Sequence, residues 1–465
     1  MLSRPRSRHR PSAAVYPHLA YVASLAPSRM RLGLENIARV LERLGNPERM
    51  VPAVLVAGTN GKGSVTTYCA AVFRAAGLRV GAYYSPHLFR IHERIRCGGA
   101  EVSSRELDEA VGRVREAAGP AALTYFECLT AAAILIFRER AVDIAVFEVG
   151  LGGRLDATNL VDAAATVVTG ISRDHREHLG ATKRRILAEK LGILRPGIPL
   201  VANLGPAALE RQAREAAAAA GAPWHSVRGE TRGEIARIDP DGMAVRLETP
   251  RRDYGTLFTR MIGAAQAGNV ATAVRTVEVL DESLAARRAS LRRTARRRPR
   301  RGLDRLAMRC AGIASGRAVR SGVAEAFLPG RFQTISRDPH VIVDVSHNEE
   351  SFVAAIDTLR TLDPAGRSVL VFGMLAHKEL GSFPSRAAAA VDTIVVTPLA
   401  DRRSAPAENL AAAFRGASAR RRRAEIVPAR GMAEAMRAAR LAAGERGVVL
   451  VMGSHVAVEE AAPYI

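Results

Sequence analysis

Cysteine is scarce in this sequence of 465 residues: only Cys69, Cys97, Cys128 and Cys310 occur, and none stands in a CxxC pair. This pattern argues against a cysteine zinc site and against a disulfide framework. Unpaired thiols in a large chain are typical of a reducing compartment, so we expect a cytoplasmic protein.

Long apolar runs are missing as well. No stretch of 18 or more apolar residues occurs, so we expect no transmembrane helix and no membrane partner. The chain also lacks the pattern of a signal peptide. Residues 1–14 contain four arginines with serine and proline and no acid. A short transit peptide has such a composition, but we interpret the segment as a disordered tail or an over-extended start.

Acidic residues are nearly absent from one internal segment. Residues 284–320 contain 13 arginines and a single acid, Asp304, and together with the N-terminal segment they account for most of the net charge of +22. So basic a chain suggests a nucleic-acid partner. The charge is confined to short segments, however, and no aromatic residue interleaves the arginine run to stack on bases. We therefore interpret 284–321 as a solvated linker or a partly helical insertion, and we expect no nucleic-acid partner.

Apolar runs that predict strands alternate with helical patterns in two parts of the chain. In the first part the strand candidates are 52–57, 78–84, 142–149, 165–171 and 198–203, with helical patterns such as 64–76, 127–140 and 182–194 between them. In the second part the strand candidates are 340–345, 368–373, 392–397 and 447–452. Such alternation is typical of an α/β layer with a mostly parallel sheet. The sequence thus predicts one domain over 15–283 and a smaller one over 322–465.

A candidate phosphate loop follows the first predicted strand. Residues 58–64 read GTNGKGS and open a helix, which is the setting that a phosphate loop requires. Glycines let backbone N–H groups turn inward, and the helix N-terminus adds partial positive charge. Lys62 can neutralise the β- and γ-phosphates, and the Ser64 hydroxyl can bind Mg²⁺. The spacing departs from the strict GxxxxGK[ST] pattern because position 56 is valine. The predicted ATP-binding residues here are Gly58, Thr59, Asn60, Gly61, Lys62, Gly63 and Ser64.

Further motifs lie on both sides of this loop. They are LGLENIARVLERLGNPE (32–48), SPHL (85–88), ERI (93–95), TYFE (124–127), FEVGLGGRLDATN (147–159), ISRDHREHLGATKRRILAEKLGIL (171–194) and GAAQAGN (263–269). With the loop, they resemble the folylpolyglutamate synthase and dihydrofolate synthase family of the Mur-ligase-like superfamily. The wider superfamily shares the GTNGK loop, whereas SPHL and LGGRLDATN favour the folate branch. The resemblance is dense over 17–283 and looser over 322–465.

The resemblance implies a fold and a reaction. The expected fold is α/β, with an N-terminal P-loop ATPase-like domain on a mostly parallel sheet and a smaller C-terminal Rossmann-like domain. The expected enzyme is an ATP-dependent ligase that adds L-glutamate to dihydropteroate, to (poly)glutamylated tetrahydrofolate, or to both. Its partners would be these small molecules, and we expect a monomer. ATP would activate the acid as an acyl phosphate, so the main task of the site is to neutralise charge between two anions.

The resemblance also implies metal sites. Glu148 ends an apolar strand, where a carboxylate is well placed to hold a cation beside a phosphate loop. By resemblance, Ser85 and His175 complete a second Mg²⁺ site with Glu148, and Lys190 is carbamylated, which turns a cation into an anion that helps to hold this ion. ATP and two Mg²⁺ ions are therefore the expected cofactors, with a monovalent cation as a further candidate. Lys62, Lys190 and His175 are the expected catalytic residues, and Ser64 is the expected ligand of the first ion.

Substrate-binding residues follow from the same resemblance. The folate acid is expected over three stretches of the first domain, at Met30, Arg31, Leu32, Leu123, Thr124, Tyr125, Phe126, Arg154, Leu155 and Asp156. Arg154 and Asp156 are the expected polar contacts among these. Outside the phosphate loop, the nucleotide is expected to meet Asn269, Arg331, Asp344 and His347.

Three motifs depart from the family pattern. Ala265 stands where a histidine is usual, Glu349 stands where a proline usually follows DVSHN (344–348), and HKE (377–379) stands where Asp-Lys-Asp is common. We therefore predict intact chemistry in the first domain and weaker or retuned docking of the second.

Three alternatives to this ligase remain open. A catalytically weak paralogue would bind ATP or folate without efficient turnover, as the altered C-terminal motifs suggest. A different ligase of the superfamily would act on a peptidoglycan precursor or a polymer, which SPHL and LGGRLDATN disfavour. A nucleic-acid-binding protein would use the arginine run, and its binding would be steeply salt-dependent.

Overall fold

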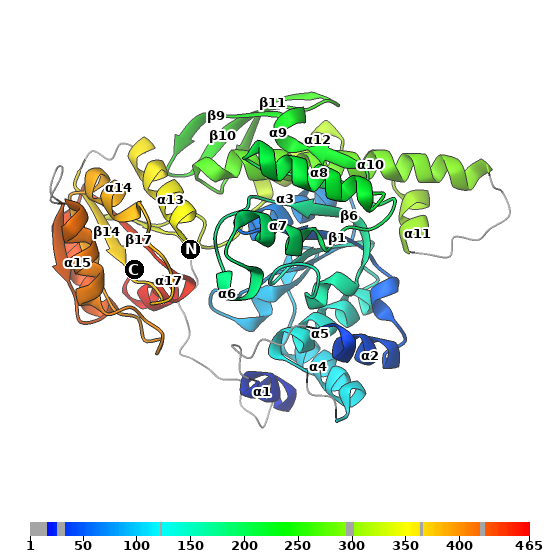
Figure 1. Cartoon of the computed structure of the whole chain (residues 1–465), viewed down its shortest axis with the longest axis horizontal. Coiled ribbons are helices and arrows are strands. Elements are labelled where there is room, and N and C mark those ends of the chain that lie inside the picture. The colour runs from blue at the N-terminus through cyan, green and yellow to red at the C-terminus, as the bar shows by residue number, and fades with distance from the viewer. Residues whose placement is uncertain (1–15, 26–32, 121–122, 294–301, 363–365, 419–423) are drawn as a thin grey trace.

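The computed structural model describes residues 16–25, 33–120, 123–293, 302–362, 366–418 and 424–465. Within them the chain forms two α/β units that lie side by side along the longest axis of the molecule (Figure 1). The tail predicted at 1–14 lies outside the described residues. Of the helices in the described ranges, none combines the length and apolarity needed to cross a lipid bilayer.

The first unit is built on an eight-stranded sheet in the order β4-β3-β2-β5-β1-β6-β7-β8. Its strands are β1 (Pro52–Ala57), β2 (Val80–Tyr83), β3 (Ile95–Cys97), β4 (Ala100–Glu101), β5 (Ile144–Glu148), β6 (Asp162–Val168), β7 (Leu200–Ala202) and β8 (Trp224–Ser226). Strands β2, β5, β1, β6, β7 and β8 run parallel, and β3 and β4 at one edge pair in antiparallel fashion. The predicted mostly parallel sheet is confirmed, and the five strands predicted for this part of the chain all lie in it.

Helices cover both faces of this sheet. The helices are α1 (Pro17–Ser24), α2 (Glu35–Arg43), α3 (Lys62–Ala75), α4 (Ser104–Ala118), α5 (Tyr125–Glu139), α6 (Arg176–Leu179), α7 (Lys183–Leu191), α8 (Ala207–Ala219), α9 (Val227–Glu230), α10 (Ala264–Arg293), α11 (Gly302–Arg309) and α12 (Gly316–Glu325). Leu55 of β1 packs in one apolar core with α2, α4 and α5, and its neighbours Val54 and Val56 pack in another with α3 and α10. A strand buried on both faces has to be apolar throughout, which is why the run PAVLVA predicts it.

The Arg-rich segment is helical over much of its described length. Helix α10 crosses the boundary predicted at residue 284, and α11 and α12 follow it. Helix α12 packs closely on α3, because a Cβ atom at Gly322 would lie 2.5 Å from the Cα of Val72. Arg287 of α10 and Arg309 of α11 form ion pairs with Asp304 and Asp143. The described part of the segment is thus packed against the first unit and does not form a free linker.

A small antiparallel sheet, not predicted from the sequence, packs against α10. It contains β9 (Arg232–Asp239), β10 (Gly242–Glu248) and β11 (Asp253–Thr259) in the order β11-β10-β9. The buried carboxylate of Glu278 on α10 accepts hydrogen bonds from the hydroxyls of Thr249 at 2.7 Å and Tyr254 at 2.9 Å. Arg275 donates to its other oxygen at 3.3 Å. A buried charge persists when it is paired and hydrogen-bonded in this way.

The second unit contains a six-stranded sheet in the order β12-β13-β17-β14-β15-β16. Its strands are β12 (Gln333–Arg337), β13 (His340–Val343), β14 (Ser368–Phe372), β15 (Thr393–Val396), β16 (Glu425–Pro428) and β17 (Val448–Met452), and its helices are α13 (Glu349–Thr361), α14 (Phe383–Ala390), α15 (Ala407–Ser418), α16 (Met432–Ala443) and α17 (His455–Ala461). All strand pairs except β12–β13 are parallel. The four strands predicted for this part of the chain are confirmed as β13, β14, β15 and β17, as is a second, smaller α/β domain.

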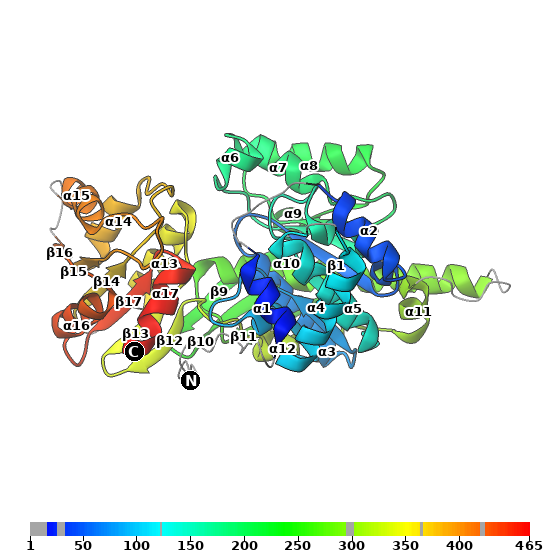
Figure 2. The same cartoon turned by 90° about the horizontal axis from the view of Figure 1, so that it is seen from below.

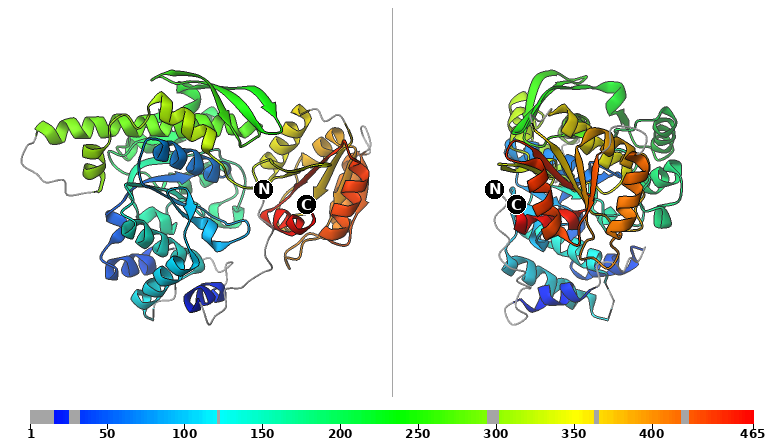
Figure 3. Two further views of the ribbon diagram at one scale, coloured as in Figure 1. Left: turned by 180° about the vertical axis from the view of Figure 1, so that it is seen from behind. Right: turned by 90° about the vertical axis from the view of Figure 1, so that its left-hand side faces the viewer.

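Segments that follow parallel strands in both sheets meet in the space between the two units, which Figures 2 and 3 show from below and from behind. In the first unit these segments follow β1, β2, β5 and β6, and in the second unit they follow β13, β14 and β17. Crevices at the carboxyl ends of parallel strands are where α/β proteins place their ligands.

Candidate active site between the two units

One cavity of about 1390 Å³ lies between the units and is lined by both. From the first unit it receives the phosphate loop, the segments around residues 84–88 and 148–157, and the start of α10. From the second unit it receives residues 328–332, the DVSHN segment and residues 454–456. The cavity therefore brings together motifs that are up to several hundred residues apart in the sequence.

The phosphate loop is held in shape by close packing around its glycines. Gly58 has φ +148, and a Cβ there would lie 1.7 Å from the hydroxyl of Thr169. Gly61 has φ +88, and a Cβ there would lie 2.4 Å from the amide oxygen of Asn269. The Thr169 hydroxyl also donates to the carbonyl oxygen of Asn60 at 2.7 Å. Only glycine suits these two positions, so the loop has the fixed, backbone-lined form that cradles phosphate groups.

Lys62 begins α3 inside this loop, and its Nζ donates to the carbonyl oxygen of Thr59 at 3.0 Å. Burial lowers the pKa of Lys62, while the nearby carboxylates of Glu148, Asp174 and Asp156 oppose that shift. A partly buried ammonium group at a helix N-terminus is a strong partner for an anion. Its position fits the predicted phosphate contact.

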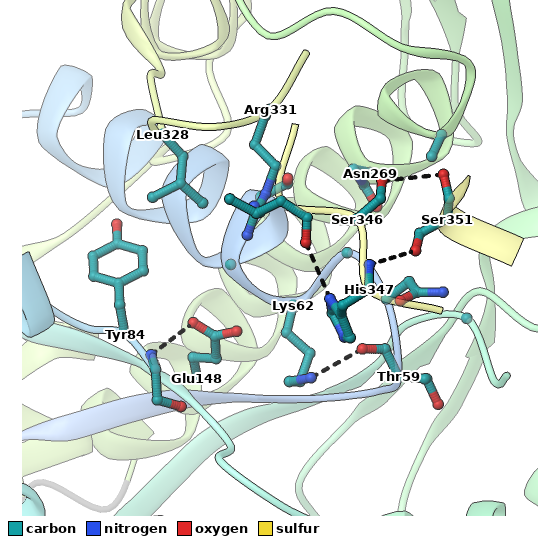
Figure 4. Close-up of a pocket in the computed structure, with 18 of the residues that line it drawn as sticks. Thr59, Lys62, Tyr84, Glu148, Asn269, Leu328, Arg331, Ser346, His347 and Ser351 are labelled. Atoms are coloured by element: carbon teal, nitrogen blue, oxygen red, sulfur yellow. Dashed lines mark hydrogen bonds between the residues drawn. The ribbon is translucent and has the colours of Figure 1, made fainter. Parts of the chain in front are cut away.

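Glu148 ends β5, where its Oε2 accepts a hydrogen bond from the backbone N–H of Ser85 at 3.0 Å. Figure 4 shows its carboxylate close to Lys62. Burial raises the pKa of Glu148, and the charge of Lys62 counteracts this. The Ser64 hydroxyl is also buried and lies 3.4 Å from the amide nitrogen of Gln266.

The donor set suits hard divalent cations that are bound together with a nucleotide. It consists of the Ser64 hydroxyl, the Glu148 carboxylate and His175, all on the cavity wall. Over the described ranges, no group of three or more histidine, cysteine or acidic side chains could hold a metal ion. Mg²⁺ commonly takes one or two protein ligands and completes its shell with substrate phosphates and water. These residues therefore fit Mg²⁺ together with a phosphate ligand.

His175 lies just beyond the end of β6, in the left-handed conformation with φ +50, and it lines the cavity. Burial lowers the pKa of His175 to about 4, with Asp174 opposing and Lys378 and Lys62 adding to the shift. Its imidazole is therefore neutral near pH 7, which is the form that binds metal ions. The neighbouring Asp174 lies 3.4 Å from Nε2 of His347 in the second unit.

Lys190 is buried in α7, and its Nζ donates to the carbonyl oxygen of Gly58 at 2.8 Å. Burial, aided by the charge of Lys62, lowers the pKa of Lys190 to about 7. A substantial fraction of this amine is therefore uncharged near neutral pH, unlike an ordinary lysine.

The other predicted nucleotide contacts also reach the cavity: Asn269, Arg331, Asp344 and His347 all line it. Arg331 and His347 extend from the second unit towards the phosphate loop (Figure 4). The carboxylate of Asp344 accepts backbone hydrogen bonds from Phe332 and Ser346, both at 2.8 Å. Asp344 therefore shapes the segment that carries Arg331.

The predicted folate residues are only partly brought together. Thr124, Tyr125, Phe126, Leu155 and Asp156 line the cavity. Met30, Arg31 and Leu32 lie outside the described residues. Leu123 is buried and is not among the residues that line the cavity.

The two expected polar folate contacts have other partners in the structure. Arg154 does not reach the cavity wall, because its guanidinium pairs with Glu189 at 3.1 Å. Asp156 is buried and accepts hydrogen bonds from the backbone of Leu151 at 2.8 Å and Thr158 at 3.0 Å. Its carboxylate thus orders the 151–158 loop beside the cavity.

Several cavity residues were not predicted. Arg94 and Arg96 lie over the rings of Tyr125 at 5.3 Å and Tyr84 at 5.4 Å, and His455 lies 5.9 Å from the ring of His347. The ERI motif contains Arg94 but does not reveal that this residue, which ends the short 3-10 helix Ile91–Arg94, lines the cavity.

A compositional signal could have pointed to part of the site. The chain has 68 basic residues but uses lysine only at Lys62, Lys183, Lys190 and Lys378. Lys62 and Lys378 line the cavity, Lys190 bonds to the phosphate loop, and Lys183 begins α7 and pairs with the second unit. Lysine persists where a compact ammonium or a titratable amine is needed, since arginine provides neither.

The substituted motif at 377–379 makes ionic contacts between the units. Nζ of Lys378 lies 2.5 Å from Asp174, and Glu379 pairs with Arg176 at 2.7 Å. These positions therefore connect the second unit to the segment after β6, next to His175.

Comparison with known proteins gives a family match for each of the two units. The family model described as Mur ligase middle domain matches residues 56–277, and the one described as Mur ligase, glutamate ligase domain matches residues 330–455. A dihydrofolate synthase/folylpolyglutamate synthase of Escherichia coli (strain K12) is 35% identical over 398 residues, which cover 84% of this chain and 83% of that protein.

Two solved structures are similar to nearly the whole chain. Escherichia coli FolC in complex with DHPP and ADP is 31% identical, with a TM-score of 0.77 and coverage of 95% of this chain and 94% of that chain. A bifunctional folylpolyglutamate synthase/dihydrofolate synthase with Mn, AMPPNP and L-glutamate bound is 30% identical, with a TM-score of 0.75 and coverage of 95% of both chains. The similarity therefore extends over both units and the cavity between them.

Proposed function

The chain belongs to the dihydrofolate synthase/folylpolyglutamate synthase family of Mur ligases, and from this we propose that it is an ATP-dependent ligase that adds L-glutamate to dihydropteroate, to (poly)glutamylated tetrahydrofolate, or to both. The observation that carries the proposal is the phosphate loop at 58–64, which faces Glu148 and, across one cavity, Arg331 and His347 of the second unit. The nucleotide, metal and glutamate ligands of similar structures support it.

ATP is proposed to bind with its β- and γ-phosphates in the loop, next to Lys62 and Arg331. The carboxylate of the folate acid attacks the γ-phosphorus, which forms an acyl phosphate and releases ADP. The amine of L-glutamate then attacks the acyl carbon, and the tetrahedral intermediate expels phosphate to leave the amide. Both reactants of the first step are anions, so Lys62 and Arg331 lower its barrier by offsetting their repulsion.

We propose two Mg²⁺ ions, one held by Ser64 with the nucleotide and one held by Ser85, Glu148, His175 and carbamylated Lys190. When bound, these ions would neutralise phosphate charge and polarise the phosphoryl group. The neutral imidazole of His175 and the hard oxygen of Glu148 support this assignment. The monovalent cation expected from the resemblance finds no specific support among the described residues.

Both walls of the proposed site come from one chain, because the cavity is lined by both units of the same molecule. We therefore propose that the enzyme acts as a monomer, and the absence of a cysteine framework supports a cytoplasmic location. The folate acid is proposed to lie against Tyr125, Phe126 and Leu155. Arg94 and Arg96 add positive charge to this wall, which suits substrates that carry carboxylates.

The direct test is an assay of the purified protein with ATP, Mg²⁺ and L-glutamate, in which ADP release is measured with dihydropteroate and with tetrahydrofolate separately. We expect release that depends on glutamate and on at least one of the two acids. Nucleotide binding without such release would favour the catalytically weak paralogue. Release with a peptidoglycan precursor but with neither folate acid would favour another ligase of the superfamily.

Carbamylation of Lys190 is a separate prediction. Carbon dioxide adds to the uncharged amine, and the uncharged fraction of Lys190 grows as the pH rises through about 7, whereas an ordinary lysine remains charged there. In protein equilibrated with carbon-13 bicarbonate, we expect a carbamate signal by NMR that increases over this pH range. The signal should be missing from Lys190→Arg, which keeps a positive charge without an addable amine. An unchanged signal in that variant would assign the carbamate to another amine.

A further inference from the structure

Glu350 connects the second unit to the first at the edge of the cavity. It is the second residue of α13, and its Oε2 accepts a hydrogen bond from the hydroxyl of Ser172. Its Oε1 lies 2.5 Å from Nζ of Lys183. Ser172 lies in the segment between β6 and α7, which also carries His175, and Lys183 is the first residue of α7. A single carboxylate thus contacts the chain on either side of a proposed catalytic residue.

Ser172 extends this connection to the phosphate loop. Its side chain is almost completely buried, at 3% exposure, and its hydroxyl accepts a hydrogen bond from the amide nitrogen of Asn60 at 3.1 Å. The side chains of Asn60 and Asn348 exchange two further hydrogen bonds, at 2.8 and 3.1 Å. The hydroxyl of Thr59 donates to the carbonyl oxygen of Ser172 at 3.3 Å. The loop, the segment after β6 and the start of α13 therefore share one polar cluster.

Two features separate this cluster from ordinary surface ion pairs. The Glu350–Lys183 pair itself is exposed, and such pairs contribute little to stability. The bond from Ser172, in contrast, joins a buried hydroxyl to a carboxylate, and charge-assisted bonds of this kind are stronger than neutral ones. Lys183 is also one of only four lysines in the chain, and the other three lie in the cavity or beside its phosphate loop.

We propose that Glu350 is a positioning residue of the ligase: it fixes Ser172, and through Ser172 the side chain of Asn60 in the phosphate loop, when the two units are together. Its kinetic effect rests on the proposed function, but its effect on the order of the loop does not. Without the carboxylate, Asn60 keeps its bonds to Ser172 and to Asn348 at the start of α13, but Ser172 loses its own bond to α13, so the cluster is held less firmly. Nucleotide binding should suffer first, because the loop has to be in place before phosphate groups can be held.

The adjacent Glu349 provides a matched control. Its Oε1 accepts hydrogen bonds from the backbone N–H of Ser382 at 2.7 Å and from the Ser382 hydroxyl at 2.8 Å, so these hydrogen bonds remain within the second unit, and the charges of Arg173 and Lys183 reach it from the first unit. Both glutamates lie in the first turn of α13, where negative charge stabilises a helix. Replacing either one by glutamine removes the same charge from the same turn and from the neighbourhood of Lys183, and the hydrogen bond to Ser172 of the first unit is altered only in Glu350→Gln.

The experiment compares the full-length variants Glu350→Gln, Glu350→Asp and Glu349→Gln with the unmodified chain. Hydrogen–deuterium exchange, measured without ligands, should show about tenfold faster exchange of the amides over 58–61 and 172–175 in Glu350→Gln, because one charge-assisted bond is lost. Steady-state kinetics should show a KM for ATP raised about tenfold with a smaller change in kcat. Glu350→Asp should recover part of both effects, and Glu349→Gln should stay within about twofold of the unmodified chain.

Equal effects of Glu350→Gln and Glu349→Gln would overturn the proposal, because the loss would then come from the helix terminus. Unchanged exchange and KM in Glu350→Gln would overturn it as well. If the unmodified chain releases no ADP with any folate acid while the exchange difference persists, the proposed function fails and the positioning role of Glu350 stands. The two ideas are therefore tested separately.

Discussion

Lys62→Ala is expected to lower kcat/KM by about 10³-fold, the size of effect seen when one donor to a developing anion is removed from a closed site. The physical reason is its position: the Lys62 ammonium is partly buried at the start of α3, in a loop whose tightly packed glycines leave no space for another side chain to replace it. Steady-state assays of glutamate-dependent ADP release would measure this loss, and nucleotide binding should weaken in parallel.

The Lys62 experiment needs a control for folding. Arg237→Ala on β9 removes an exposed cation far from the phosphate loop in sequence, where its guanidinium pairs with Asp239 at 3.1 Å, and it should change the activity less than about twofold. Thermal unfolding of both variants shows whether either fold is damaged. Near-normal turnover in correctly folded Lys62→Ala would remove Lys62 from its proposed phosphate role.

Glu148→Gln is expected to have the second-largest effect, because it keeps the shape of a buried strand-end side chain but removes its charge. At a fixed Mg²⁺ concentration we expect kcat to fall about 10²-fold, and the Mg²⁺ concentration for half-maximal rate to rise about tenfold. The amide oxygen of glutamine can still accept the N–H of Ser85, so the variant should fold. A titration of the rate against Mg²⁺ measures both changes.

Glu234 supplies the matched control for Glu148. It also lines the cavity, but from the exposed strand β9. Glu234→Gln removes the same charge from the same cavity, and its Mg²⁺ dependence should equal that of the unmodified chain. If Glu148→Gln also keeps the normal Mg²⁺ dependence, Glu148 is not a ligand of the metal.

The parallel sheets could be predicted because their strands are buried on both faces, and such strands are apolar throughout. Strand β9 could not be predicted in this way. Its side chains over 232–237 are exposed, and its stretch RGEIARID has too few apolar residues to show a clear alternation. The packing of the arginine-rich segment could not be predicted for a different reason. Leu303 and Leu306 of α11 bury their side chains in the core of the first unit, so a few apolar residues suffice to pack a helix that is otherwise basic.

Most of the candidate site was predicted from short sequence motifs. Gly58, Lys62 and Glu148 follow strands whose ends share one edge of a sheet, so their proximity follows from the fold. Arg154 lies in an equally recognisable motif, yet it turns away to pair with Glu189. The direction of a side chain in a loop depends on its neighbours in space, which a motif does not specify.

Contacts between the units were beyond prediction for a related reason. Nothing in the sequence around Glu350 or Lys378 shows that Ser172, Lys183 and Asp174 lie opposite them. These pairs depend on how the two units are placed relative to one another. From the sequence alone, the altered motifs could therefore be interpreted only as a change in the docking of the second unit. The structure shows which residues the altered motifs contact in the first unit.

The unusual distribution of lysine has a practical consequence. Side-chain amines are the targets of acylating reagents and of reductive alkylation, and guanidinium groups resist both. In this chain, every side-chain amine lies in the cavity between the units or on the elements beside it, so the α-amine of the N-terminus is the one other amine that would compete for a covalent amine probe. Amine reagents can therefore label the ligand-binding region selectively among side chains, without any engineered residue.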